Sequence, residues 1–551
     1  MTQVLSFKES SKKIAQHFLQ TVVAVDDRIR FESRPTADDD ELIEPDDSDL
    51  GELEADDSGQ QVTAPLSHEL YYQDLSHEFA SKGIICGGFS PQEEDLASSL
   101  KAVVATSKNS DITILDWQME IAGIDGEFAT NTILSLSEID ISEGGRTRLI
   151  CIYTAENADI VAATLNASLK ELKPKLNKHT LTFNVSTLTH WKIEVVNKGD
   201  TLEAGLCDLL ILSFTELTAG LLSNAALSSI ASIRDNTHNL LHKFNKELDT
   251  AYLSHVLGLI SSPDMREQAN EVAFDYAVDL ISEELKSELQ ISQIVKGSLS
   301  KEVLEAWPKY MSPRQKAKRF KITMGQEKRE FNNGTMEKLL SASKEEDLIA
   351  VLENDLNIKG DDAKSTLDVF NKALIQLSFD KYDSKPLLDL CSLESTRRNL
   401  DTLKTHIPVL KQGTLIKGEA KKYYLCIQPV CDTVRLKGSQ SFTFIETSIS
   451  AGDFTHVMKS SNSHLKLKII PSAKHIKTIS FLADDERKAV LSVINANGVP
   501  EFSGGSIEEP IFFEWCGEFK FTISQAIVNG LAAQLARVGL DSFEWLRQKQ
   551  K

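Results

Sequence analysis

The first 225 residues alternate short apolar runs with longer segments whose apolar residues recur at helical spacing. Short apolar runs predict buried strands, and the helical spacing predicts amphipathic helices. The predicted strands are 22–27, 83–89, 111–116, 148–154 and 191–197, with 180–185 as an additional candidate. The predicted helices are 6–20, 67–82, 92–107, 126–139, 156–173 and 202–222. Strands that alternate with helices in this way indicate an α/β domain at 1–225, a doubly wound parallel sheet of five principal strands in flavodoxin-like order.

The pattern changes after residue 225, where strand-like runs become rare. We expect a helical region at 226–410, with long helices at 222–260 and 264–290. Within this region the segment 314–329 is strongly basic, which predicts a linker or an exposed helix.

From residue 411 the chain becomes rich in strand-like runs again. The predicted strands are 423–429, 441–447, 464–471, 477–482 and 509–522, and a helix is predicted at 523–548. This pattern indicates an α+β domain at 411–551. Several domains are also expected because a chain of 551 residues is too long for a single core.

An acidic segment interrupts the first predicted domain at about 31–66. Residues 38–57 include 12 acidic residues and no basic one, which accounts for more than half of the net charge of −21. Such a block repels itself and lacks the apolar residues needed for a core, so we expect a disordered insertion. Its position close to the first predicted strand would also allow it to steer partners.

The composition narrows the functional classes. A net charge of −21 argues against nucleic acid as a partner. We find no apolar run of membrane-spanning length and no signal peptide, so no membrane association is expected. The seven cysteines form no CxxC pair, which favours reduced thiols and a cytoplasmic location.

Charged or reactive side chains stand at the C-terminal ends of four predicted strands. They are Asp26 and Asp27, Asp116, Thr154 and Lys198. In a parallel α/β sheet these strand ends meet at the edge where ligands bind. A carboxylate cluster with one hydroxyl and one ammonium suits a metal ion and a phosphoryl group. Taken singly, each residue has a simpler interpretation, since aspartate and threonine often cap helices or turns and lysine is often an exposed strand-end charge.

Four motifs carry a family resemblance when they are taken together. They are VVAVDD at 22–27, LDWQM at 115–119 with Asp125 and Gly126 downstream, IYTAEN at 152–157, and VVNK at 195–198. In this order they resemble the receiver domain of two-component response regulators. The resemblance covers about residues 15–225, less than half of the chain.

The resemblance implies a chemistry for the strand-end residues. Asp116 would accept a phosphoryl group from the phosphohistidine of a sensor histidine kinase and become an acyl phosphate. Lys198 would pair with the phosphoryl oxygens, and the hydroxyl of Thr154 would hydrogen-bond to them. The implied Mg²⁺ ligands are Asp26, Asp27, Asp116 and the backbone carbonyl of Gln118.

The sequence departs from the receiver pattern in several places. Val195 stands where these domains usually carry an aromatic switch residue, and Gly199 replaces the proline that usually follows the lysine. The loop after the phosphoacceptor is lengthened by residues 120–124. These changes leave the phosphorylation chemistry in place but argue against the usual coupling from Thr154 to an aromatic side chain.

The remainder of the chain contains no P-loop, HExxH or GxSxG motif. By what it lacks, the chain is similar to the receiver-only member of the Detocs antiphage defence system. That resemblance implies a phosphoryl acceptor, not an enzyme, that buffers a phosphorelay beside a second receiver fused to an effector. Two alternatives stay open. One is a response regulator whose C-terminal part is an effector that uses Cys431 and Asp432, and the other is a non-phosphorylated adaptor with a degenerate receiver.

Overall fold

The computed structural model of the chain divides into two compact units. The first comprises Met1–Phe244 and Ser282–Pro313, and the second comprises Asn245–Ile281 and Arg314–Lys551. The structure describes residues 6–34, 68–92, 95–119, 123–263, 265–266, 269–325, 327–358, 361–372, 375–402, 406–460, 463–505 and 508–536. Most of the predicted acidic insertion therefore lies outside the described residues. Among the described helices, none is long and apolar enough to cross a membrane.

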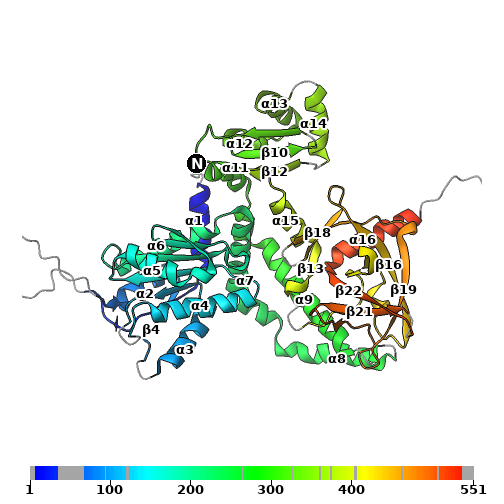
Figure 1. Cartoon of the computed structure of the whole chain (residues 1–551), viewed down its shortest axis with the longest axis horizontal. Coiled ribbons are helices and arrows are strands. Elements are labelled where there is room, and N and C mark those ends of the chain that lie inside the picture. Colours follow the sequence, from blue (N-terminus) through cyan, green and yellow to red (C-terminus); the bar gives the residue numbers. More distant parts are fainter. Residues whose placement is uncertain are drawn as a thin grey trace, which may run out of the picture. The chain divides into compact units, whose positions relative to one another are not determined.

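The first unit is built on a seven-stranded sheet with the strand order β4-β1-β5-β6-β9-β8-β7. Strand β4 at one edge of this sheet is labelled in Figure 1. The first five strands of this order pair in parallel, and β8 and β7 add an antiparallel hairpin beside β9. The strands are β1 (Thr21–Val25), β4 (Ile85–Phe89), β5 (Ile112–Leu115), β6 (Arg148–Thr154), β7 (Pro174–Asn177), β8 (Thr180–Phe183) and β9 (Trp191–Asn197). The five predicted parallel strands and their flavodoxin-like order are confirmed. The additional candidate strand at 180–185 is confirmed as β8, and β7 is the strand of this sheet that was not predicted.

Helices cover both faces of this sheet. One core joins the sheet to α3 (Leu96–Asn109), α4 (Glu127–Ser142) and α5 (Ala158–Ser168). The other core joins it to α1 (Phe7–Phe18), α2 (Tyr72–Ser81) and α6 (Glu203–Thr218). All seven residues of β6 are buried, as expected for a central strand covered on both sides.

A buried ion pair supports the α4 side of the sheet. Arg148 donates from Nε to Oδ2 of Asp140 at 2.7 Å, and both residues are at most 1% exposed. The indole N–H of Trp191 donates to the same carboxylate at 3.1 Å. Because two charges are removed from water here, loss of either partner would leave an uncompensated buried charge.

The first unit continues beyond the sheet with α7 (Leu221–Lys243), which packs against α1. The predicted helix at 222–260 is therefore wrong in its length, because α7 ends at Lys243 and α8 (Asp249–Ser261) begins after a 3-10 turn capped by Asn245. Helix α8 and the part of α9 (Ala269–Ile291) up to Ile281 belong to the second unit. The rest of α9, with α10 (Gln293–Ser298) and α11 (Lys301–Met311), completes the helices of the first unit. Helix α10 packs against α7, and α11 packs against α1.

The second unit contains a small sheet that the sequence did not predict. Its strand order is β11-β10-β12, formed by β10 (Phe320–Met324), β11 (Glu327–Phe331) and β12 (Ile375–Phe379). Helices α12 (Asn333–Ser341), α13 (Glu345–Asn354) and α14 (Asp361–Asn371) lie between β11 and β12 in the chain. The prediction of a linker or exposed helix at 314–329 is wrong, since Phe320, Ile322 and Met324 are buried in β10.

The C-terminal part of the second unit is a barrel-like sheet. The strand path β22-β14-β15-β16-β19-β21 is closed by pairing between β21 and β22. These strands are β14 (Thr414–Lys417), β15 (Tyr423–Cys426), β16 (Ser439–Ile449), β19 (Ile476–Leu482), β21 (Pro500–Gly505) and β22 (Pro510–Phe519). Helix α16 (Phe521–Leu535) packs on a second core through Ile527 and Leu531. The prediction of a β-rich region followed by a helix is confirmed.

Candidate functional site

The predicted strand-end residues meet at the carboxyl edge of the parallel sheet. Asp26 and Asp27 follow β1, Asp116 follows β5, Thr154 ends β6 and Lys198 follows β9. Backbone hydrogen bonds continue the sheet past the strand ends, from the Asp116 N–H to the Val25 carbonyl at 2.9 Å and from the Lys198 N–H to the Thr154 carbonyl at 2.7 Å. The sheet itself therefore fixes the positions of these side chains.

Lys198 connects two of the carboxylates. Its ammonium lies 2.8 Å from Oδ2 of Asp26 and 3.1 Å from Oδ1 of Asp116. The three side chains are 2–5% exposed. The simpler interpretation of Lys198 as an exposed strand-end charge is therefore wrong.

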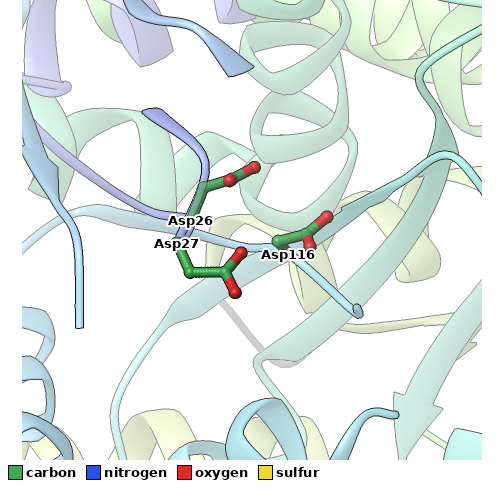
Figure 2. A group of neighbouring side chains, drawn as sticks. All are labelled: Asp26, Asp27 and Asp116. Atoms are coloured by element: carbon green, nitrogen blue, oxygen red, sulfur yellow. The ribbon is translucent and has the colours of Figure 1, made fainter. Parts of the chain in front are cut away.

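The three aspartates form a compact cluster (Figure 2). Asp26, Asp27 and Asp116 each offer a carboxylate oxygen, and these oxygens lie within 4.8 Å of one another. Burial raises the pKa of Asp116 to about 7, and the negative charges of Asp26 and Asp27 act in the same direction, whereas Lys198 lowers it. Burial lowers the pKa of Lys198, but the two carboxylates outweigh burial and keep its pKa above the usual value. The cluster thus concentrates negative charge that a cation would relieve.

The donor set fits a hard divalent cation. Oδ1 of Asp27 is buried and makes no hydrogen bond within the described part of the chain. A buried carboxylate oxygen without a hydrogen bond raises the free energy of the folded protein unless a cation or a hydrogen-bond donor pairs with it. Carboxylate and carbonyl oxygens are the ligands that Mg²⁺ prefers. The side-chain amide of Gln118 donates to Oε1 of Glu156 at 2.6 Å, and the backbone carbonyl of Gln118 remains a predicted ligand.

Thr154 is fully buried, and its hydroxyl accepts a hydrogen bond from the Glu156 N–H at 3.1 Å. The N-cap of α5 is Asn157, whose side chain accepts from the N–H groups of Asp159 and Ile160. The simpler interpretation of Thr154 as a helix cap is therefore wrong. Thr154 ends β6, the neighbour of β5 in the sheet, and its role at the site remains a prediction.

The loop after Asp116 is closed by a glycine. Gly126 has φ of 76°, and its N–H donates to the Trp117 carbonyl at 2.8 Å. A Cβ at this position would come within 2.2 Å of the Trp117 ring, so the close approach requires glycine. Val195, which replaces the usual aromatic residue, is buried in the sheet core.

The structure adds two contacts that the sequence did not reveal, one at each end of segment 35–67. Before it, Arg34 forms an ion pair with the buried Glu203 at 3.0 Å. After it, the backbone carbonyl of His68 accepts a hydrogen bond from the Lys198 ammonium at 2.7 Å. Strands β2 (Ile29–Arg30) and β3 (Leu70–Tyr71) pair beside these contacts. Both are long-range contacts with no local sequence pattern.

Cys431 and Asp432, the candidate effector residues, lie in the second unit. The Cys431 thiol is exposed and donates to Oδ1 of Asp432 at 3.4 Å. In the described ranges no histidine hydrogen-bonds to this thiol, and His464 instead pairs with Asp389 at 2.9 Å. A nucleophilic cysteine needs an adjacent base, so this geometry does not favour the effector alternative.

Comparison with known proteins agrees with the sheet order and the aspartate cluster. Residues 18–201 match the family model of the response receiver domain. No curated protein and no solved structure matches the chain. The match covers about a third of the chain and ends before α7. It identifies the chain as a protein that contains a response receiver domain.

Proposed function

We propose that the protein is a response-regulator-like phosphoryl acceptor and that Asp116 takes its phosphoryl group from a partner sensor histidine kinase. The observation that carries this proposal is the buried ammonium of Lys198 in contact with both Asp26 and Asp116. Phosphoryl transfer depends chiefly on positioning and on neutralising charge, and this arrangement supplies both at one edge of the sheet.

The transfer step makes one bond and breaks one. A carboxylate oxygen of Asp116 bonds to phosphorus while the P–N bond to the donor imidazole breaks. The electron pair of that bond stays on the imidazole nitrogen, which takes up a proton from water. The step needs the ionised carboxylate, and burial raises the pKa of Asp116 to about 7. Lys198 favours the step because its positive charge opposes that rise.

Asp26, Asp27, Asp116 and the backbone carbonyl of Gln118 would hold Mg²⁺ at this site. The ion supplies positive charge for the phosphoryl oxygens and reduces the repulsion between the carboxylates. Lys198 would then pair with a phosphoryl oxygen, and the Thr154 hydroxyl would donate a hydrogen bond to another.

Lys198 also offers a way for phosphorylation of Asp116 to change the structure away from the site. A phosphoryl group on Asp116 competes for the ammonium that now holds the His68 carbonyl. Weakening that contact would loosen the pairing of β2 with β3 at the ends of segment 35–67. This coupling through Lys198 does not require an aromatic residue at position 195, where the chain has valine.

For the biological role, we propose that the protein buffers a phosphorelay in antiviral defence. The kinase would serve this protein and a second receiver that carries an effector. By mass action, an acceptor without an output takes up phosphoryl groups from low kinase activity, so only a strong signal reaches the effector. The proposal rests on the receiver domain and on the lack of P-loop, HExxH and GxSxG motifs in the sequence.

Incubation with the partner kinase, ATP and Mg²⁺ tests phosphoryl transfer. We expect an alkali-labile label on the wild-type protein, no label on Asp116→Ala, and normal labelling of Asp125→Ala, an exposed control in the following loop. Stoichiometric labelling of Asp116→Ala would overturn the assignment.

Growth of unstressed cells tests the buffering role. The cells carry the operon that encodes this protein, the kinase and the second receiver with its effector. Asp116→Ala removes the competing acceptor and keeps the rest of the chain, so it should make the operon toxic, whereas Asp125→Ala should not. Healthy cells that have only lost the defence response would show that the protein transmits the signal instead of buffering it.

A further inference from the structure

A cavity of about 550 Å³ lies in the first unit at the amino ends of the sheet strands. Its wall includes Phe18 before β1, Asp111 before β5, Thr147 before β6 and His190 before β9. Asp116 follows the opposite end of β5. Since a strand rises about 3.3 Å per residue, the cavity lies more than roughly 10 Å from Asp116 and is separate from the phosphorylation site.

One side of the cavity is apolar. Phe214 and Leu217 come from α6, Leu227 and Ile230 come from α7, and Phe18 completes this side. The volume lies within the range of about 300–1,000 Å³ that is typical of small-molecule sites, which combine apolar walls with a few polar groups.

Arg146 supplies a cation that pairs with no carboxylate among the described residues. Its guanidinium donates to the Ser110 carbonyl at 3.3 Å and forms no salt bridge within the part of the chain that the structure describes. Burial lowers the pKa of Arg146, and the neighbouring Arg148 lowers it further. The acids that act on Arg146 each pair with another cation: Asp140 with Arg148 at 2.7 Å, Glu143 with Lys108 at 2.8 Å, and Asp111 with Arg234 at 3.5 Å.

Arg234 adds a second cation that is held in place. It donates to the Phe18 carbonyl at 2.9 Å, and its guanidinium lies 4.5 Å from the centre of the Phe18 ring. Asp111 is the one acidic residue among the described residues of the wall, and its second oxygen already accepts the N–H groups of Gln20 and Thr21 at 2.9 and 3.1 Å. The wall therefore carries an excess of positive charge beside an apolar surface.

We propose that this cavity binds a small organic acid, with its apolar body against Phe18, Phe214 and Ile230 and its carboxylate or phosphate group against Arg146. Half-buried guanidinium groups recognise both kinds of anion through paired N–H donors. Helix α7 lies beyond the matched residues 18–201, so a ligand here contacts both the receiver domain and the helix that follows it. The site does not depend on phosphorylation of Asp116.

Isothermal titration calorimetry on the full chain tests this site with four probes. We expect saturable binding of decanoate or decyl phosphate with one site per chain, and the tighter of the two identifies the preferred head group. Uncharged 1-decanol should bind at least about tenfold more weakly, because it lacks the charge that Arg146 would meet. Inorganic phosphate, which has no apolar body, should not bind measurably. Failure of both amphipathic anions to bind below millimolar concentration would overturn the proposal.

Two variants and a control locate the site. Arg146→Gln should weaken binding of the preferred anion about ten- to a hundredfold and leave decanol binding unchanged. Ala226→Phe, which fills the cavity from α7 and keeps both arginines, should weaken anion and decanol alike. Arg314→Gln removes an exposed arginine of the second unit and should change nothing. Thermal unfolding curves establish that wild type and Arg146→Gln are both folded. Equal binding of the anion by these two proteins would then show that it binds elsewhere.

Discussion

Replacing the phosphoacceptor should stabilise the metal-free protein. A carboxyl group whose pKa is about 7 in the folded protein binds its proton more tightly than in the unfolded chain, where the pKa of aspartate is about 3.9. The folded state therefore loses stability as the pH rises from about 4 to about 7, because the buried group must ionise. Asp116→Asn has the shape of the protonated carboxyl and never ionises, so it avoids this loss.

The size of the effect follows from the two pKa values. At about 1.4 kcal/mol for each pKa unit, the difference corresponds to about 4 kcal/mol above pH 7, taken as an upper limit. Lys198 would keep its contact with Asp26 at 2.8 Å, so the substitution does not leave a buried ammonium unpaired. We expect Asp116→Asn to be more stable than wild type by a few kcal/mol at about pH 8 and equally stable near pH 4.

Pulsed hydrogen exchange in urea measures this difference in the receiver domain alone. Peptides from β5 and β6 report unfolding of the sheet, whatever the second unit does. The samples contain EDTA, and Asp125→Asn serves as a control because Asp125 is exposed in the same loop. Excess Mg²⁺ should stabilise wild type and reduce its difference from Asp116→Asn. A variant that is less stable than wild type at pH 8, or a difference that does not change with pH, would refute the reasoning.

Three further predictions concern the metal, the buried ion pair and the loop glycine. Asp27→Ala should abolish Mg²⁺ binding in calorimetry while the sheet stays folded, and a folded variant that binds Mg²⁺ normally would contradict its role as a ligand. Asp140→Ala should lower the free energy of unfolding by about 3–5 kcal/mol, because Arg148 is left buried without its partner, and a loss below about 1 kcal/mol would contradict the ion-pair argument. Gly126→Ala should destabilise the receiver domain by about 2 kcal/mol or more, because the new Cβ meets the Trp117 ring and φ is positive; unchanged urea unfolding would show that this loop adapts freely.

The parallel sheet was predictable because its central strands are covered on both faces. A strand such as β6 must then be apolar along its whole length, and this gives a clear local signal. The charged residues at the strand ends were predictable for the same reason, since the strand order brings those ends together. The antiparallel strand β7 has the sequence PKLN and is half exposed, so it carries no comparable signal.

The small sheet of the second unit was not predicted, because the alternation of apolar and polar residues in β10 lies within a strongly basic segment. Strand β10 alternates buried Phe320, Ile322 and Met324 with polar residues, but basic residues surround it in the sequence. Lys321 is accommodated there by an ion pair with Glu330 on β11. At the candidate site, the contact of Lys198 with the His68 carbonyl could not be predicted, because 130 residues separate the two and a backbone acceptor leaves no sequence pattern.

Chemical trapping of the acyl phosphate tests the central claim most directly. The protein is incubated with acetyl phosphate and Mg²⁺, reduced with borohydride, and its peptides are sequenced by mass spectrometry. Borohydride converts an aspartyl phosphate to homoserine, so the account predicts homoserine at position 116 in a reaction that requires Mg²⁺ and is lost in Asp27→Ala. Homoserine at another aspartate, or an unmodified Asp116 in a folded protein that binds Mg²⁺, would contradict the assignment of Asp116 as the phosphoryl acceptor.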